Sequence, residues 1–121
     1  MKILILEDSP YRNKTFSKKL FRHDVYIYDN VVDAIDAINL IGPFDLYFLD
    51  HDLDGEIFVG SEKANTGYQL AKYMTKEEVE GSIIIHSLNP AGAANMKAAL
   101  PQALVIPFSA LTDILDEIGE K

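Results

Sequence analysis

Short apolar runs without polar alternation restrict most strongly what this 121-residue chain can fold into. Lys2–Leu6, Asp45–Leu49 and Ser82–Ile85 each carry consecutive Ile, Leu, Phe or Tyr residues. A strand with one solvated face would instead alternate apolar and polar residues. Strands that lack this alternation are typical of parallel sheets covered by helices on both faces. We therefore predict an α/β protein built on a parallel sheet.

Helical patterns separate these runs along the whole chain. Strands are expected at residues 2–6, 25–28, 45–49, 82–85 and 104–106, and helices begin after Ser9, Asn30, Asn65, Asn89 and Ser109. The first helix is expected to run to about Arg22 and to bury Phe16, Leu20 and Phe21. Right-handed crossovers then give a doubly wound five-stranded sheet of order 2-1-3-4-5, in one domain that spans residues 1–121.

Composition narrows the class of protein. Hydrophobic residues make up 48% and charged residues 25%, as in globular domains, and no apolar run reaches the roughly 18 residues of a membrane span. The absence of cysteine favours a cytoplasmic protein. A net charge of −8 disfavours general binding to nucleic acids, because neutralising phosphates requires a basic surface.

Acidic residues follow two of the predicted strands. Glu7 and Asp8 end the first strand, and Asp50 and Asp52 follow the third. In a sheet of this order, ligands lie beyond the carboxyl ends of the strands, between the first and third strands. Carboxylates gathered there predict a divalent metal site formed by Glu7, Asp8, Asp50 and Asp52. Mg²⁺ is the expected ion, with Mn²⁺ or Zn²⁺ as alternatives.

Two histidines also lie at predicted strand ends. His51 follows Asp50 directly, and His86 ends the fourth strand. With Asp50 they are candidate catalytic residues, because imidazoles titrate near neutral pH and can move protons on a phosphoester. They are alternatively ligands of a softer metal. His23 is instead expected to be a packing or surface residue.

Polar residues near two helix starts are candidate phosphate ligands. Ser87 and Asn89 precede the fourth predicted helix, whose first N–H groups suit an anion, although Asn89 is equally well explained as a helix cap. Thr66 opens the third helix at the end of a polar segment, residues 56–65. We expect that segment to form a mobile flap over the pocket, with Lys63, Asn65 and Thr66 as candidate substrate contacts.

Over nearly its whole length the chain resembles the receiver domains of response regulators, with their flavodoxin-like fold. The similarity rests on Glu7-Asp8, on the strand that ends at Asp50, on the Gly67 that opens a helix, and on Ile106-Pro107-Phe108. In receivers the acidic pair and the phosphoacceptor aspartate bind magnesium, and the aspartate becomes an acyl phosphate. The resemblance therefore implies these roles for Glu7, Asp8 and Asp50.

Two motifs differ from ordinary receivers. Ile106 replaces the lysine that grips the phosphoryl group, and His86-Ser87 replaces the usual threonine or serine and small residue. With Asp50–Leu53 and His86–Pro90, the chain resembles a divergent receiver-like family proposed to process cyclic phosphates on nucleic-acid ends or nucleotides. This resemblance implies a phosphorylated small molecule or a nucleic-acid end as substrate.

These observations leave open three hypotheses. The preferred one is a metal-dependent hydrolase that acts on cyclic phosphates. The second is a single-domain receiver that is phosphorylated on Asp50 and acts through a separate regulatory partner protein. The third is a degenerate receiver that serves only for protein contacts. No membrane partner is expected.

Overall fold

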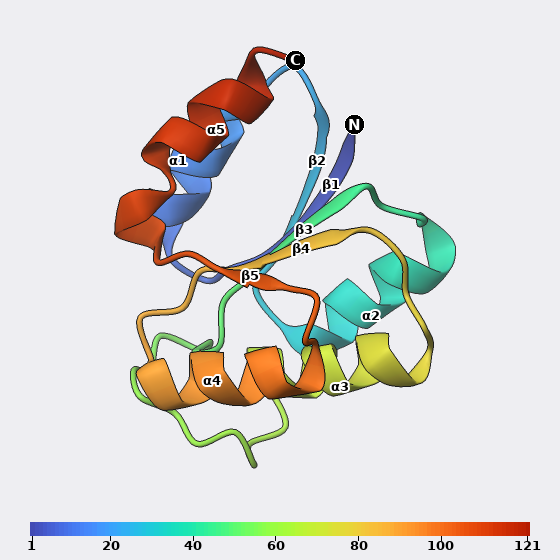
Figure 1. Ribbon diagram of the computed structural model, residues 1–121, viewed down its shortest axis with the longest axis vertical. Coiled ribbons are helices and arrows are strands. Elements are labelled where there is room, and N and C mark those ends of the chain that lie inside the picture. Colours follow the sequence, from blue (N-terminus) through green and yellow to red (C-terminus); the bar gives the residue numbers. More distant parts are fainter.

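The computed structural model describes residues 1–121 and contains one five-stranded sheet between two layers of helices (Figure 1). The strands are β1 (Lys2–Leu6), β2 (Asp24–Tyr28), β3 (Leu46–Leu49), β4 (Ser82–Ile85) and β5 (Leu104–Val105). All of them pair in parallel, in the order β2-β1-β3-β4-β5. The predicted doubly wound α/β sandwich and its strand order are confirmed.

Helices cover both faces of the sheet. One layer holds α1 (Pro10–Lys19) and α5 (Thr112–Gly119), and the other holds α2 (Val31–Leu40), α3 (Gly67–Lys76) and α4 (Pro90–Ala99) (Figure 1). A short 3₁₀ turn, η1 (Phe108–Ala110), precedes α5. Side chains of the residues before α1, α2 and α4 accept hydrogen bonds from the first turns of these helices, as expected for N-caps.

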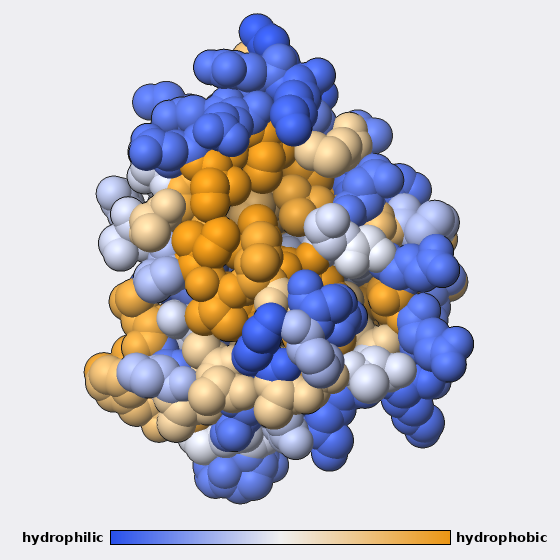
Figure 2. Space-filling view, viewed as in Figure 1, coloured by the Kyte–Doolittle hydropathy of each residue, from blue (hydrophilic) through white to orange (hydrophobic).

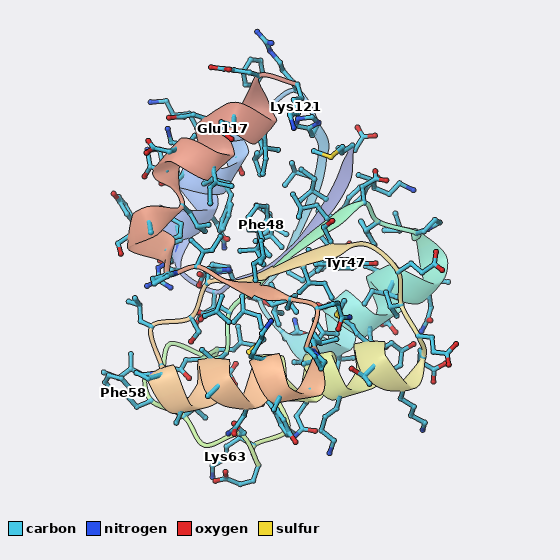
Figure 3. All side chains as sticks on the ribbon, viewed as in Figure 1. Tyr47, Phe48, Phe58, Lys63, Glu117 and Lys121 are labelled. Carbon is cyan, nitrogen blue, oxygen red and sulfur yellow. The ribbon has the colours of Figure 1, made fainter.

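The two layers bury separate apolar clusters, because successive strand residues point to opposite faces of the sheet. Tyr47 packs in the cluster under α2, α3 and α4, whereas its neighbour Phe48 packs under α1 and α5 (Figure 3). Both side chains are fully enclosed. Burial on both faces explains why the strand sequence carries no polar alternation.

Two expectations about helix ends are wrong. Helix α1 ends at Lys19, so Phe21 lies in the following turn and is 73% exposed, while Phe16 and Leu20 are buried as predicted. Ser109 does not cap the last helix, because it lies inside η1. The Ser109 hydroxyl is therefore not placed where it could accept from the first turn of α5.

One face of the molecule exposes apolar side chains near β5. Figure 2 shows an apolar patch between α4 and α5, over the edge strand that carries the exposed Leu104 and Val105. None of the helices has the length and hydropathy that crossing a bilayer requires.

Candidate functional site

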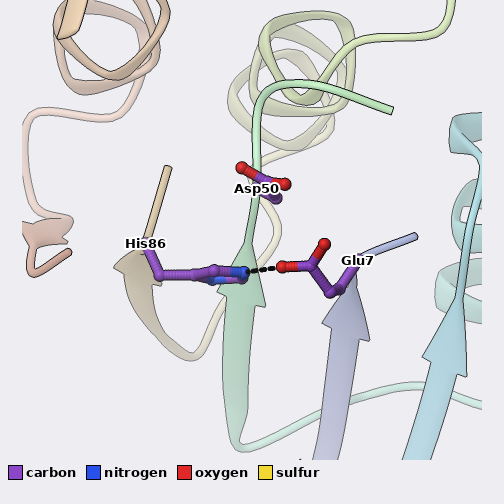
Figure 4. Close-up of side chains that lie close together, drawn as sticks. All are labelled: Glu7, Asp50 and His86. Atoms are coloured by element: carbon purple, nitrogen blue, oxygen red, sulfur yellow. Dashed lines mark hydrogen bonds and ion pairs between the residues drawn. The ribbon is translucent and has the colours of Figure 1, made fainter. Parts of the chain in front are cut away.

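The parallel register brings Glu7, Asp50 and His86 together at the carboxyl ends of three adjacent strands (Figure 4). Leu6 pairs with Leu49, and Leu49 pairs with Ile85, so the next residue of each strand falls in one row. Each of the three offers a ligand atom within 4.8 Å of the others, and all three residues are buried. The predicted convergence of the strand ends is therefore present in the fold.

Glu7 is the most completely hydrogen-bonded member of this row. Its Oε2 accepts from the backbone N–H groups of Asp8 (3.0 Å) and Ser9 (3.1 Å). Its Oε1 accepts from His86 Nε2 (2.9 Å) and from Arg12 Nη1 (3.3 Å). Burial acts to raise the pKa of Glu7, but these donors, His86 first among them, lower it to about 2. Glu7 is therefore a permanent anion near neutral pH.

Asp50 has a different environment although it lies beside Glu7. Its Oδ1 accepts from the His51 backbone N–H at 2.8 Å, whereas no N–H group donates to Oδ2, which lies 3.8 Å from Arg12 Nη1. Burial and the neighbouring Glu7 charge raise the pKa of Asp50 to about 7. Two adjacent carboxyl groups thus differ in their charge near neutral pH.

Arg12 completes the site, and it was not singled out from the sequence. It lies in the first turns of α1, where Ser9 caps the helix, and its guanidinium reaches both Glu7 and Asp50. The same group stacks over the ring of Phe108, with its carbon 5.1 Å from the ring centre. The sequence offered one signal that could have identified Arg12: it is a basic residue in the helix that follows the acidic strand end.

His86 is fully buried at the floor of the site. Its Nε2 donates to Glu7, and its ring packs against Phe16 and Phe108, with ring centres 5.4 and 6.3 Å away. Burial lowers the pKa of His86 despite the neighbouring Glu7 carboxylate, so the ring is neutral. Its Nδ1 is buried and has no hydrogen-bond partner.

His51 belongs to the loop that follows β3 and does not lie in the row of strand ends. Its Nδ1 donates to Asp52 Oδ1 (2.8 Å), and its Nε2 accepts from Ser61 Oγ (2.9 Å). The ring also packs against Gly92 of α4 so closely that a Cβ atom there would overlap it. Both ring nitrogens are occupied, and His51 joins the loop to α4.

Asp52 and Asn89 belong to the same network. The Asp52 carboxylate accepts from the backbone of Phe58 (2.6 Å) and Val59 (3.3 Å) and from Asn89 Nδ2 (3.0 Å). Partial burial acts to raise the pKa of Asp52, but the bonds from His51 and Asn89 lower it below its usual value. Asn89 also caps α4 by accepting from the Gly92 N–H. The network fixes the loop in place.

An open pocket of about 430 Å³ lies above Glu7 and Asp50. Its wall includes Asp8, whose carboxylate accepts from the Gly55 N–H and whose pKa is raised by partial burial. The lining residues are Glu7, Asp8, Ser9, Pro10, Arg12, Asp50, Asp52, Gly55, Glu56, Ile57, Phe58 and Leu88. The pocket combines an ionic floor with an apolar rim.

The remaining predicted phosphate ligands lie outside this pocket. Ser87 Oγ accepts from the Asn89 N–H (3.1 Å) and borders a separate hollow beside α4. Thr66 is buried and donates to the Lys63 carbonyl (3.0 Å). Lys63 itself lies in the loop beyond α4, away from the row of strand ends (Figure 3). The Ser87 and Thr66 side chains are therefore hydrogen-bonded to backbone groups of nearby residues and do not border the pocket.

The acidic residues could bind a metal ion. Asp50 and Asp8 border the pocket, and hard divalent cations prefer the oxygen ligands that carboxylates supply. The pKa of Asp50 is raised by burial and by the Glu7 charge although Arg12 lies 3.8 Å away, and the two carboxyl groups share this one arginine. A bound cation would supply the missing positive charge, so the donor set fits one.

Comparison with known proteins agrees with the geometry. A family model described as "Cyclic-phosphate processing Receiver domain" matches residues 2–102. No curated protein sequence matches the chain significantly. Among solved structures, the N-terminal domain of a response regulator/sensory box/GGDEF 3-domain protein from Carboxydothermus hydrogenoformans has a TM-score of 0.71 at 23% identity, covering 99% of this chain and 91% of that one.

Two response regulators are also similar in fold. The Mn²⁺-bound form of Rcp1 has a TM-score of 0.66 at 15% identity, with 96% of this chain and 89% of that chain covered. The phosphorylated cyanobacterial phytochrome response regulator RcpA has a TM-score of 0.72 at 16% identity, with 98% and 91% covered. At these identities the similarity establishes the receiver fold.

Proposed function

This chain belongs to the family of cyclic-phosphate processing receiver domains, and on that premise we propose that it is a phosphoesterase that opens cyclic phosphates. One observation carries the proposal. Arg12 and Asp50 border the same open pocket, and Arg12 Nη1 lies 3.8 Å from Asp50 Oδ2, an oxygen to which no N–H group donates. One group can hold the phosphate while the other handles a proton.

Arg12 is the group that we assign to the substrate phosphate. Its planar fork of N–H donors matches phosphate oxygens, and its side chain is partly exposed to the pocket. The Glu7 carboxylate and the Phe108 ring both contact the guanidinium and hold it in place. We propose that Arg12 takes the phosphate-binding role of the lysine that receivers carry at the position of Ile106.

Asp50 is the group that we assign to proton transfer. It borders the pocket and no N–H group donates to its Oδ2, so it can take a proton from an attacking water and return one to the departing sugar oxygen. In this step the water oxygen bonds to phosphorus, and the bond from phosphorus to one ring oxygen breaks. That oxygen leaves with the electron pair and is protonated to a hydroxyl group. The product is a phosphate monoester.

We assign positioning roles to the two histidines that were candidate proton carriers. His86 is enclosed, and its Nε2 proton holds Glu7. Both nitrogens of His51 are bonded within the loop network. Neither imidazole borders the pocket, so neither is within reach of a phosphate there.

A divalent cation fits beside these groups, and we propose Mg²⁺, held by Glu7, Asp8 and Asp50 (Mn²⁺ and Zn²⁺ remain alternatives). When bound, such an ion neutralises phosphoryl charge and lowers the pKa of a coordinated water. Glu7 keeps its charge at neutral pH, which favours this role. Asp52, the fourth predicted ligand, also borders the pocket, and we assign its carboxylate to holding the loop through the Phe58 and Val59 N–H groups and Asn89.

The direct test is hydrolysis of 2′,3′-cyclic nucleotides by purified protein with Mg²⁺, Mn²⁺ or Zn²⁺. We expect a phosphate monoester product, and loss of at least about 100-fold in rate for Asp50→Asn, since a general base contributes 10²–10⁴-fold. Arg12→Gln should reduce the rate similarly. Arg22→Gln is the matched control, because Arg22 is exposed and lies outside the pocket. Absence of product with every metal would refute the proposal.

A second function is supported by the same Asp50 oxygen. Oδ2 is free of N–H donors, so it could attack the phosphorus of a phosphodonor and form an acyl phosphate as the leaving group departs. Signalling would then require a separate partner protein. Incubation with acetyl phosphate and Mg²⁺ should add one phosphoryl mass that Asp50→Asn lacks. Turnover without a lasting mass gain favours the phosphoesterase.

A further inference from the structure

Three large apolar side chains surround the mouth of the pocket above Glu7 and Asp50. Ile57 and Phe58 come from the loop after β3, and Leu88 comes from the segment between β4 and α4. They are 77%, 68% and 57% exposed. Two separate segments of the chain thus present apolar surface to solvent at the edge of one ionic pocket.

The Phe58 ring is held in this exposed position by the backbone. Phe58 has a φ of 53°, in the left-handed region that bulky residues rarely adopt. Its N–H donates to Asp52 Oδ2 at 2.6 Å, and Asp52 is itself bonded to His51 and Asn89. Figure 3 shows the ring projecting outward beside the start of α4. A buried polar network therefore maintains an aromatic ring at the pocket mouth.

We infer that Phe58, with Ile57 and Leu88, forms a rim that binds the base of a nucleotide whose phosphate lies over Arg12 and Asp50. This inference rests on the proposed function, and it names the substrate class for the same pocket. Aromatic side chains stack on any base, because every base has a π-face. A bare sugar phosphate has no group that would cover this apolar surface.

Size and charge restrict the nucleotide to a short one. The pocket volume of about 430 Å³ lies within the range of about 300–1,000 Å³ that small-molecule sites occupy. The net charge of −8 opposes a long polyanionic strand. A mononucleotide or a strand end presents one base and one phosphate without that repulsion.

Binding of two monoesters that cannot be opened further tests the rim independently of hydrolysis. The probes are adenosine 3′-monophosphate and ribose 3-phosphate, each titrated into the full-length protein with Mg²⁺. We expect the nucleotide to bind at least about tenfold more tightly, as stacking of one base provides. Phe58→Ala should reduce this preference to near unity and leave the Kd of the sugar phosphate unchanged.

Three variants separate the ring from other effects. Phe58→Trp should retain the preference, and Phe58→Gly, which relieves the left-handed backbone, should lose it as Phe58→Ala does. Phe21→Ala is the matched control, since Phe21 is equally exposed but lies outside the pocket. A preference that survives Phe58→Ala, or equal or undetectable binding of both probes, overturns the inference.

The results for the rim and for hydrolysis are distinguishable. A Phe58-dependent preference in a protein that opens no cyclic nucleotide supports the rim and removes the proposed function. Hydrolysis of cyclic phosphates without any preference for a nucleotide over a sugar phosphate supports the proposed function and removes the rim.

Discussion

His86 Nε2 lies 2.9 Å from Glu7 Oε1, and this contact joins the ends of β4 and β1 across the strand between them (Figure 4). Both side chains are enclosed, and the neutral ring provides one of the four donors from which Glu7 accepts hydrogen bonds. The contact keeps Glu7 ionised beside Asp50. The different charges of the two carboxyl groups therefore depend on a histidine that does not border the pocket.

Replacing His86 should destabilise the fold. His86→Ala removes a donor from a buried carboxylate and leaves a space beside Phe16, so we expect a loss of about 3 kcal/mol in the free energy of unfolding. Urea denaturation at pH 7 measures the loss. His86→Gln, which keeps a side-chain donor, should lose less. Equal losses in both variants would show that the hydrogen bond to Glu7 is not the cause.

Asp50 should make the protein less stable as the pH rises from about 4 to 7. Its pKa is about 7 in the fold, against an ordinary value of 3.8, so the folded state binds one more proton than the unfolded state between these values. Stability contributed by that proton is present below pH 4 and lost as the pH passes 7. Asp50→Asn should therefore exceed the wild type by about 1–3 kcal/mol at pH 8.

The difference between the two proteins should be smallest near pH 4, where Asp50 is protonated in the fold and about half protonated in the unfolded chain. Below pH 4.5 both should lose stability together, because the pKa of Glu7 is about 2 in the fold against an ordinary 4.5. Denaturation curves at pH 4, 6 and 8 measure the difference. A difference that is constant with pH would contradict the raised pKa of Asp50.

Divalent cations should stabilise the protein at neutral to alkaline pH. A site half-saturated near 1 mM would add about 1.4 kcal/mol at 10 mM Mg²⁺, which thermal unfolding at pH 8 would detect as a raised Tm. The gain should shrink at pH 5.5, because a proton competes with the cation for Asp50. It should be absent in Asp50→Asn and retained in Glu62→Gln, which changes an exposed acid of the loop.

Gly92 should tolerate no side chain. A Cβ atom there would overlap the His51 ring, so Gly92→Ala should cost about 1–3 kcal/mol and loosen the loop that carries Phe58. Gly60→Ala is the matched control in the same loop, because its Cβ would meet only the flexible end of Glu62. Hydrogen exchange of the Phe58 amide follows the loop directly. If the Phe58 amide exchanged at similar rates in both variants, packing of the His51 ring against Gly92 would not be what holds the loop in place.

The sequence pattern was sufficient to predict the strand order and to predict that Glu7, Asp50 and His86 lie close together. Parallel strands in known order end at one edge of the sheet, so residues that follow the strands must be neighbours. The position of Phe21 was not predictable from the same pattern, because the apolar spacing continues past Lys19, where the helix ends. The loop after β3 has no period at all, and its network could not be read from the residue order.

The sequence by itself determined the fold and the backbone position of the acidic strand ends, since strand period and crossover handedness depend on local pattern. Only the tertiary structure decided the direction of each side chain. It brought Arg12 onto the two carboxyl groups, enclosed both rings of His51 and His86, and left the ring of Phe58 at the pocket mouth. These outcomes depend on how helices and loops pack against the sheet, and packing is a property of residues distant in the chain.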